Sequence, residues 1–321
     1  MSNIYRPEGS LQSLSENREY ISSYEGLERA MREGKILESN VIFCDSNLRL
    51  HIDLGDIQGV IERSEAVYCR PGENIKDIAV ISRVGKPVCF KIKSLRSDGG
   101  KRVALLSRKD AEAECDKAFI SSLRKGDIIP ATVTHLESFG AFVDIGCGLS
   151  SLLTVDSISV SRISHPRDRL SVGQTIHVVV KDRDPESNRV YVSMRELLGT
   201  WEENASTFEV GQTVSGIIRS IENYGIFIEL SPNLAGLAEL KDGMELCGES
   251  LIGKSCAVYI KSIIPDRMKI KLVLIDTCRS GLGEMQKTPI KYFVDCEKIN
   301  HLSCWRYSPN NSNKLIETIF E

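Results

Sequence analysis

The sequence lacks most of the features that mark secreted, membrane-embedded or metal-rich proteins. None of its ten cysteines forms a Cys-x-x-Cys pair, so the pattern favours reduced, mostly buried thiols over a disulfide framework. Purely apolar runs are short strand-like pieces, such as residues 178–180 and 272–275, far below the roughly 18 residues that span a bilayer. The amino terminus has neither a basic start nor an apolar stretch, which predicts a cytoplasmic protein rather than a secreted one.

An excess of charge of one sign is also lacking, because 41 Lys and Arg residues face 44 Asp and Glu residues, for a formal net charge of −3. Such a balance disfavours a protein that holds duplex DNA through many phosphates. Residues 83–109 are an exception, with nine basic side chains against Asp98 alone, and predict a basic surface unless acidic neighbours offset it. With 321 residues, of which 41% are hydrophobic, the chain can form two or three globular units.

Signatures of catalysis are missing as well. No HExxH or GxSxG motif occurs, and Asp182 and Asp184 fit a turn better than acid–base chemistry. Residues 248–255 match the phosphate-loop pattern GxxxxGK[ST], but we expect a strand rather than a helix after them, which argues against nucleotide hydrolysis. The spacing of three cysteines and one histidine in the tail matches no standard zinc site (Cys278, Cys296, His301 and Cys304). We therefore predict a protein without enzymatic activity, cofactor or metal.

Self-similarity is the strongest organisational signal. Two segments match each other at a constant offset of 85 residues, and a third, fainter copy starts at Gly34. The matching stretches are 126–136 with 211–221, Phe139-Gly140 with Tyr224-Gly225 and, for the faint copy, 51–55 with 142–146 and 84–86 with 172–174. Each copy consists of short alternating runs bounded by Gly, Asn, Asp and Pro, which indicates three tandem all-β modules.

Helix signals occur between the modules. Ser22 and Ser23 precede a helical pattern that stops at Gly34, and Thr200 with Glu203 forms a second capping-box start. The predicted boundaries are an N-terminal extension with a lead-in helix (1–33), module one (34–110), a connector (111–123), module two (124–197), a helical connector (198–210), module three (211–276) and a C-terminal extension (277–321). Residues 314–320 of that extension alternate like one further strand.

The alternation of side chains along a strand predicts which aromatic rings of module two face outward. Ala141 and Val143 point to the core, so Phe142 faces outward. It shares that wet face with Asp144 and lies near Phe139 in the preceding loop.

Module three repeats this arrangement, because Phe227 faces outward with Glu229 and lies near Tyr224. Near the end of each module the same alternation turns Arg189 and Lys269 outward. Exposed rings flanked by cations suit unpaired bases, which stack on the rings while the cations follow the backbone. The alternative is that the rings cover a hydrophobic edge or pack against a neighbouring module.

Four stretches of module two resemble the S-one RNA-binding repeat, the OB-type domain named after the largest small-subunit ribosomal protein: 139–146, 162–166, 172–174 and 184–190. Module three is a good match and module one a divergent one. The resemblance to the ribosomal protein S-one family implies an all-β fold of three tandem OB-fold, five-stranded barrels, joined by short helical connectors and followed here by a small C-terminal β extension. It also implies single-stranded RNA binding by Phe139, Phe142, Asp184 and Arg189, and by Tyr224, Phe227 and Lys269 of module three.

Several positions differ from the residues usual in this family, and these differences change how strongly we expect each module to bind RNA. Thr154 and Glu239 stand where the family usually has a histidine. Module three should bind RNA more weakly, because residues 201–276 carry seven basic against eleven acidic residues. In module one, Leu48 and His51 occupy the aromatic slots. Either His51 stacks on a base and the basic run ending the module attracts RNA, or the RNA face is lost and the module docks a protein.

One loop of module two adds positive charge beside the aromatic face. Arg162, Arg167 and Arg169 are fixed cations, and together with His165 we expect them to contact phosphates. The alternative is a solvated loop whose arginines form ion pairs that involve Asp168.

Two functions fit these observations. The first is an mRNA-binding protein of the translation apparatus, which holds single-stranded RNA near the small ribosomal subunit through module two with help from module three. The second is an interaction scaffold or RNA-turnover adaptor, which docks a protein partner such as a nuclease through module one and the tail and binds RNA weakly. Weak sequence preference is expected, because stacking tolerates every base.

Overall fold

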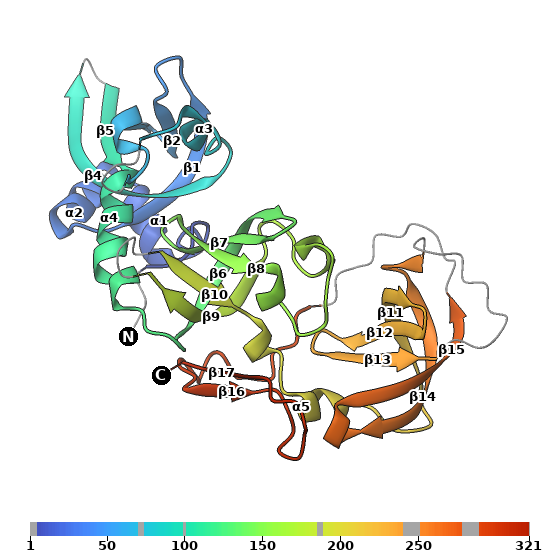
Figure 1. Cartoon of the computed structure of the whole chain (residues 1–321). Coiled ribbons are helices and arrows are strands. Elements are labelled where there is room, and N and C mark those ends of the chain that lie inside the picture. Colours follow the sequence, from blue (N-terminus) through green and yellow to red (C-terminus); the bar gives the residue numbers. More distant parts are fainter. Residues whose placement is uncertain are drawn as a thin grey trace.

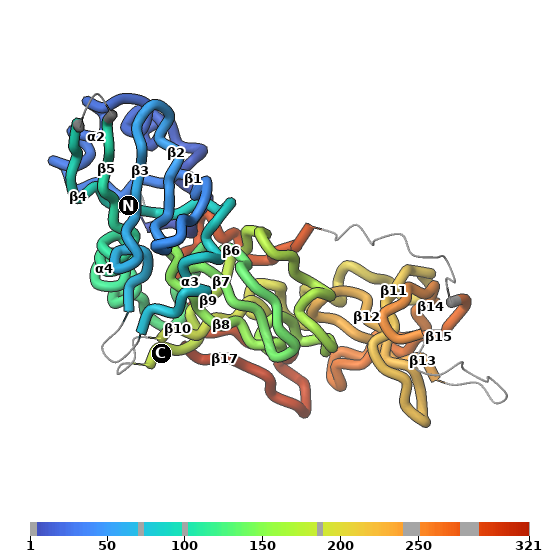
Figure 2. The backbone as a smooth tube through the Cα atoms, turned by 90° about the horizontal axis from the view of Figure 1, so that it is seen from above, coloured from blue at the N-terminus to red at the C-terminus, as the bar shows by residue number. Residues whose placement is uncertain are grey.

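The computed structural model of the chain describes residues 5–69, 74–98, 101–184, 189–239, 251–277 and 289–320. Three closed five-stranded barrels follow one another, and Figures 1 and 2 show barrel one and barrel three on opposite sides of barrel two. Numbered within each barrel, the strands of all three have the neighbour order 1-2-3-5-4 of an OB-type barrel. The predicted all-β fold of three tandem barrels is confirmed. In the part of the chain described, every helix is too short or too polar to cross a membrane.

Two α-helices precede barrel one, and a third α-helix follows it. Its strands are β1 (Leu37–Cys44), β2 (Leu50–Leu54), β3 (Ile57–Ile61), β4 (Pro87–Asp98) and β5 (Lys101–Ser107). The helices are α1 (Ser15–Ile21), α2 (Tyr24–Glu33), the 3-10 helix η1 (Arg63–Glu65), α3 (Asp77–Ile81), α4 (Arg108–Ala118) and η2 (Ile120–Ser122).

Barrels two and three have the same plan with fewer helices. Barrel two contains β6 (Ile128–Glu137), β7 (Gly140–Gly146), β8 (Leu149–Thr154), η3 (Val155–Ser157), η4 (Pro166–Asp168), β9 (Thr175–Arg183) and β10 (Val190–Ser193). The helices η5 (Arg195–Leu197) and α5 (Trp201–Ala205) lead to barrel three, which contains β11 (Thr213–Glu222), β12 (Gly225–Ser231), β13 (Leu234–Ala238), β14 (Ser255–Ile264), η7 (Pro265–Arg267) and β15 (Lys269–Thr277). The tail forms β16 (Cys304–Arg306) and β17 (Glu317–Ile319).

The predicted helix start at Ser22 and Ser23 and the stop at Gly34 are confirmed, but the expected capping box at this start is replaced by a single hydrogen bond to Ser23. The side chain of Ser23 accepts a hydrogen bond from the N–H of Gly26, and α2 ends at Gly34 in the left-handed region at φ 65°, where glycine is favoured. Before α5, Thr200 and Glu203 form the reciprocal capping box. The tail also forms the expected strand, since β17 pairs antiparallel with β16.

A recurring pair of hydrogen bonds shows that all three barrels are copies of one module. In each barrel, a glycine with positive φ donates its N–H to a carbonyl in the first strand, and the residue after the glycine accepts an N–H from the same strand position. The three donor–acceptor pairs are Gly85 with Val41 (2.9 Å), Gly173 with Val133 (2.7 Å) and Gly253 with Ile218 (2.7 Å). The faint repeat in barrel one is therefore confirmed.

The same position explains the false phosphate-loop motif. Lys254 is followed by strand β14 rather than by a helix, as expected from the repeat, so its amide groups do not form the start of a helix that could hold a phosphate. Residues 248–250 of the motif lie outside the described residues.

Two acidic residues that were expected on the wet face are buried, so this expectation was wrong. Asp144 and Glu229 lie on the outer faces of β7 and β12, but they are only 2% and 4% exposed. The reason is that neighbouring parts of the chain cover them. The N–H of Glu8 donates to Asp144 (2.7 Å), and the guanidinium of Arg169 donates two hydrogen bonds of 2.6 Å to Glu229.

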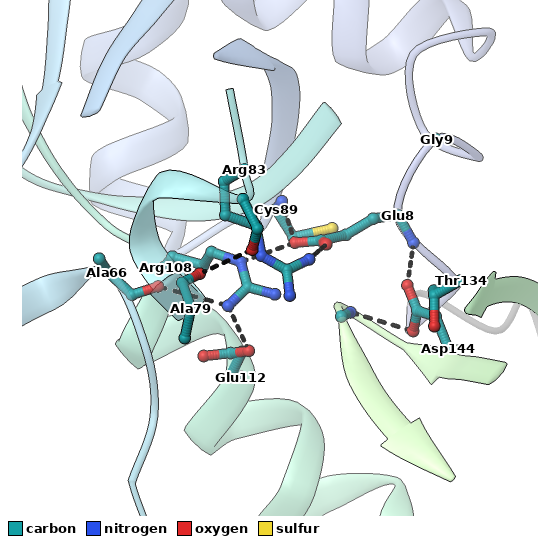
Figure 3. Close-up of polar contacts among 12 residues, drawn as sticks. Glu8, Gly9, Ala66, Ala79, Arg83, Cys89, Arg108, Glu112, Thr134 and Asp144 are labelled. Carbon is teal, nitrogen blue, oxygen red and sulfur yellow. Dashed lines mark hydrogen bonds and ion pairs between the residues drawn. The ribbon is translucent and has the colours of Figure 1, made fainter. Parts of the chain in front are cut away.

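The junction between barrels one and two is a buried charge cluster (Figure 3). Arg108 at the start of α4 pairs with Glu8 (2.8 Å) and with Glu112 (2.5 Å). Burial alone would lower the pKa of this guanidinium, but the two carboxylates outweigh burial and raise it. Burial and the charge of Glu8 raise the pKa of Asp144 to about 8, against the opposing effect of backbone N–H bonds. The cluster ties the N-terminal segment, barrel one and barrel two together.

The junction between barrels two and three uses a second ion network. Glu229 on β12 receives Arg169 from the loop of barrel two and Arg219 from β11 (2.7 Å), and Arg219 also pairs with Asp168 (3.2 Å). The side chain of Asn233 accepts the N–H of residue 160 at 2.9 Å. All of these groups connect the loop around η4 to the outer face of barrel three.

The tail packs against one side of both barrel two and barrel three. Trp305 and Tyr307 pack into the core of barrel three, whereas Phe320 packs against residues of barrel two. The carbonyl of Gly126, just before β6, accepts the N–H of Leu302 at 2.8 Å. A Cβ atom at Gly126 would lie 2.1 Å from the carbonyl oxygen of Leu302, so this close approach requires glycine.

We predict that Glu229→Gln destabilises the protein by about 3–5 kcal/mol near neutral pH, because it leaves two buried guanidinium groups facing a neutral amide. Burial opposes the ionisation of Glu229, but Arg169 and Arg219 lower its pKa below the ordinary value. The unfolded chain therefore binds the extra proton, and the stabilisation is lost as the pH falls through the lowered folded pKa. Urea unfolding should show the difference between the two proteins shrinking from about pH 6 to about pH 3.

Glu19→Gln is the matched control, because Glu19 forms an exposed ion pair with Arg29. It should change stability by less than about 1 kcal/mol. Equal effects of the two substitutions would contradict the assignment of Glu229 as the central group of this junction.

Candidate nucleic-acid interface

A row of side chains crosses the outer face of barrel two. Cross-strand pairing places Phe142 beside His135 of β6 and Leu152 of β8. Leu152 pairs with Tyr191 of β10, which pairs with Asp182 of β9. We call these five side chains the stacking row. Paired strands lie about 4.8 Å apart, and because the five strands of barrel two close on themselves, the row curves around the barrel.

Three aromatic rings lie together on this face, and a fourth, Tyr191, lies two strands from Phe142. Phe139, in the turn between β6 and β7, is 53% exposed, and its ring lies perpendicular to that of Phe142 at a centroid distance of 6.0 Å. The ring of His135 lies 6.3 Å from that of Phe142, inclined by 28°. Tyr191 is 38% exposed. The structure thus places the predicted pair Phe139 and Phe142 together and adds two rings to it.

Neither His135 nor Tyr191 was predicted from the sequence as part of this face, and the reason differs between them. Tyr191 lies between the inward-facing Val190 and Val192, so the alternation that turned Arg189 outward also turns Tyr191 outward. The signal was present in the sequence. His135 is different, because an irregularity in pairing between residues 133 and 135 shifts the register and breaks simple alternation in β6.

Charged groups border the stacking row at the ends of β9 and β10. Arg189 is exposed, and Asp184 is half-buried, with its N–H donating to the carbonyl of Arg189 at 2.9 Å. The structure therefore brings together these two predicted site residues. Lys125 donates to Asp182 (2.8 Å), and this hydrogen bond lowers the pKa of the carboxyl. Thr154, in the position of the family's usual histidine, bonds to Ser157 instead.

The loop around η4 contributes fewer cations than expected. Arg162 and Arg167 are exposed, and the Nδ1 atom of His165 accepts the N–H of Arg167 at 3.1 Å. The expectation that Arg169 reaches RNA was wrong, because its guanidinium is bound to Glu229 of barrel three. Asp168 is likewise engaged by Arg219.

Barrel three keeps only part of the aromatic face. Tyr224 is 59% exposed and lies perpendicular to Phe227 at 6.1 Å, the same geometry as Phe139 and Phe142. The predicted cation Lys269 is exposed at the start of β15. The positions of His135 and Tyr191 are taken by Ser220 and Lys271, and Lys271 lies 3.8 Å from Glu239.

Barrel one has a different arrangement from the one its sequence indicated. Leu48 lies in the turn after β1 at φ 60°, and His51 is 9% exposed. The ring on the surface is Phe43, which pairs with His51 across β1 and β2. An irregularity in pairing between Val41 and Phe43 hides this residue from the alternation pattern.

The described residues contain no group of three or more His, Cys, Asp or Glu side chains placed to hold a metal ion. Of the tail residues considered for zinc, Cys278 lies outside the described residues. His301 instead pairs with Asp127 at 2.8 Å. Of the eight described cysteines, four are buried, three are half-buried and one is exposed.

Comparison with known proteins defines the class. The family model of the S1 RNA binding domain matches residues 122–195, which enclose barrel two and its stacking row. Residues 122–195 are therefore similar to the S1 RNA binding domain.

The particular similarity is to small ribosomal subunit protein bS1. The chain is 27% identical over 282 residues to bS1 of Rhodopseudomonas palustris, across 85% of this chain and 47% of that protein. It is 33% identical over 158 residues to bS1 of Staphylococcus saprophyticus, across 48% of this chain and 40% of that protein. The chain thus spans less than half the length of these curated relatives.

Some solved structures overlap most of the chain. One of them is a multidomain protein with nucleic acid binding domains from Streptococcus pneumoniae, at 13% identity and a TM-score of 0.25, covering 76% of this chain and 74% of that chain. A TM-score this low establishes no common arrangement of domains.

We predict that Tyr191→Ala weakens binding of an unstructured RNA about tenfold, because one exposed stacking ring contributes about 1–3 kcal/mol per base. Tyr259→Ala is the matched control. Tyr259 has the same exposure, 38%, but lies on β14 of barrel three and outside the positions equivalent to the stacking row. Fluorescence anisotropy with a labelled oligonucleotide measures both affinities, and equal losses would contradict a specific role for Tyr191.

Proposed function

We propose that this protein binds single-stranded RNA, mRNA in particular, by stacking bases on the outer face of barrel two. The observation that carries the proposal is the cluster of three rings on that face, those of Phe139, Phe142 and His135, with Tyr191 exposed two strands from Phe142. Exposed rings are costly in water unless a ligand covers them, and a base has a matching flat, polarisable surface. Duplexes hide their base faces, so an unpaired strand is the ligand that fits.

Positive charge at the border of the face supports a polynucleotide rather than an isolated base. Arg189 immediately precedes β10, two residues before Tyr191, and Arg162 and Arg167 are exposed on the loop around η4. These cations contact phosphates while the rings take the bases. They are few, so we expect a shallow salt dependence, and stacking on barrel two gives little sequence preference of its own. No catalytic step is part of the proposal.

Barrel three is a weaker second site. It retains the perpendicular pair Tyr224 and Phe227 with Lys269 nearby. The loss of two rings and the carboxylate of Glu239 beside Lys271 reduce its attraction for an RNA strand. Barrel three therefore adds RNA contacts to those of barrel two rather than binding RNA alone.

The similarity to bS1 supports a place in the translation apparatus of the cytoplasm, with the small ribosomal subunit as a partner. A protein-docking role through barrel one is the second candidate. The observation that favours it is an exposed apolar surface around α3, formed by Ile78, Ile81 and Val84. Such a surface fits a protein partner better than RNA, since it carries no stacking ring.

The test compares two double variants for RNA binding. Phe139→Ala with Phe142→Ala should weaken binding of a labelled unstructured RNA by at least about 30-fold, because two stacking contacts are removed. Ile78→Ala with Ile81→Ala removes exposed apolar area of the α3 surface and should leave RNA affinity unchanged. Anisotropy at two salt concentrations gives the affinity and a slope of roughly −0.7 per phosphate contacted.

Near-wild-type RNA affinity in the ring variant would overturn the stacking proposal. If, in addition, only the α3 variant lost association with the small ribosomal subunit in a sedimentation experiment, the docking role would become the main function.

A further inference from the structure

Barrel one carries an aromatic pair with a geometry unlike that of the other two barrels. The rings of Phe43 and His51 are parallel to within 9°, with centroids 4.1 Å apart. The corresponding pair in barrel two, His135 and Phe142, is 6.3 Å apart. His51 is 9% exposed and Phe43 is 48% exposed. The histidine ring is therefore the buried member of the stack, and the phenyl ring is the member that faces solvent.

Polar contacts hold the buried ring in place. One ring nitrogen of His51, Nε2, lies 3.3 Å from Asp45, and the other, Nδ1, lies 3.3 Å from the amide of Gln58. Asp45 is itself fixed by the side chain of Arg49 (2.8 Å) and by the N–H groups of Asn47 and Arg49. A stack that is already rigid loses little conformational entropy when a ligand joins it.

The aromatic pair borders a shallow hollow of about 270 Å³. Its polar lining comes from Asp53, Asp56 and Gln58, and no lysine or arginine is among the lining residues. Asp53 and Gln58 face each other across β2 and β3, and both are exposed. These groups offer mainly hydrogen-bond acceptors, which suit N–H donors and repel phosphate.

Comparison of equivalent positions also shows which side chains of barrel two are missing from barrel one. Leu105 occupies the position of Tyr191 in the stacking row, so Val103 stands where barrel two has Arg189. Barrel one thus combines a stacking ring with acceptors and lacks this backbone-tracking cation. Such a combination fits the face and edge of one base rather than a run of nucleotides.

We propose that this hollow binds one unpaired base that carries an exocyclic amine, stacked on Phe43 with the amine toward Asp53 or Gln58. Adenine, cytosine and guanine have such an amine, whereas uracil does not. The proposal rests on the proposed function, because the base belongs to the RNA strand that barrel two holds. Barrel two then supplies affinity, and barrel one supplies preference among bases.

The experiment uses the intact protein with labelled oligo(A) and oligo(U) RNA. Phe43→Ala should weaken oligo(A) binding about tenfold and oligo(U) binding less than about threefold. Phe43→Leu, which keeps apolar packing without the ring, should behave in the same way and guards against a folding defect. Asp53→Ala should reduce the preference for oligo(A) over oligo(U) while leaving oligo(U) affinity unchanged, which a stacking effect alone would not do.

A second readout reports the contact directly. In Phe43→Trp, oligo(A) should quench the fluorescence of the introduced indole, and Phe139→Ala with Phe142→Ala in the same chain should raise the RNA concentration needed. If the wild-type protein binds neither RNA, both the proposed function and this site fail. If it binds both RNAs and the Phe43 and Asp53 variants bind as the wild type does, the base site alone is overturned, and this face is left for a protein partner.

Discussion

A carboxylate on the outer face of the second strand fixes how each later barrel sits against its neighbour. Asp144 in barrel two accepts the N-terminal segment, and Glu229 in barrel three accepts the loop of barrel two. Each acid lies two residues after an outward-facing ring, Phe142 or Phe227, on the same face of the same strand. Successive outward positions lie about 7 Å apart along a strand, so the surface that binds a neighbour and the surface that presents rings cannot move independently. The direction in which each aromatic face points therefore follows from these two buried acidic side chains.

The sequence predicted what depends on contacts within one module. Apolar alternation located the core and the outward rings Phe142 and Phe227, and capping signals located α2 and α5. It failed where the cause lies between modules or in an irregular strand. Nothing local to Glu229 shows that Arg169, sixty residues earlier, will bury it. The pairing irregularities before His135 and Phe43 shift the alternation by one residue, so both rings were missed although the strands themselves were expected.

The three barrels show how one backbone plan can take different ligands. Hydrogen bonds at Gly85, Gly173 and Gly253 are the same in all three, and the strand order is the same. What differs is a handful of side chains on the outer row, where barrel two has rings, barrel three has Ser220 and Lys271, and barrel one has a closed aromatic stack. The fold by itself does not determine the ligand, which is decided by these few surface positions.

The tail has a consequence for the order of assembly during synthesis. Residues 301–320 contact both barrel two and barrel three, yet they leave the ribosome after both barrels have been made. Domains generally fold as they emerge, so the two barrels acquire their strands first and are joined along this side later. Until the tail arrives, the edge of barrel two at Gly126 and the side of barrel three that Trp305 and Tyr307 later cover are open to solvent. A nascent chain at this stage has both barrels folded and the contact between Arg169 and Glu229 available, but it lacks the contacts that the tail adds to both barrels.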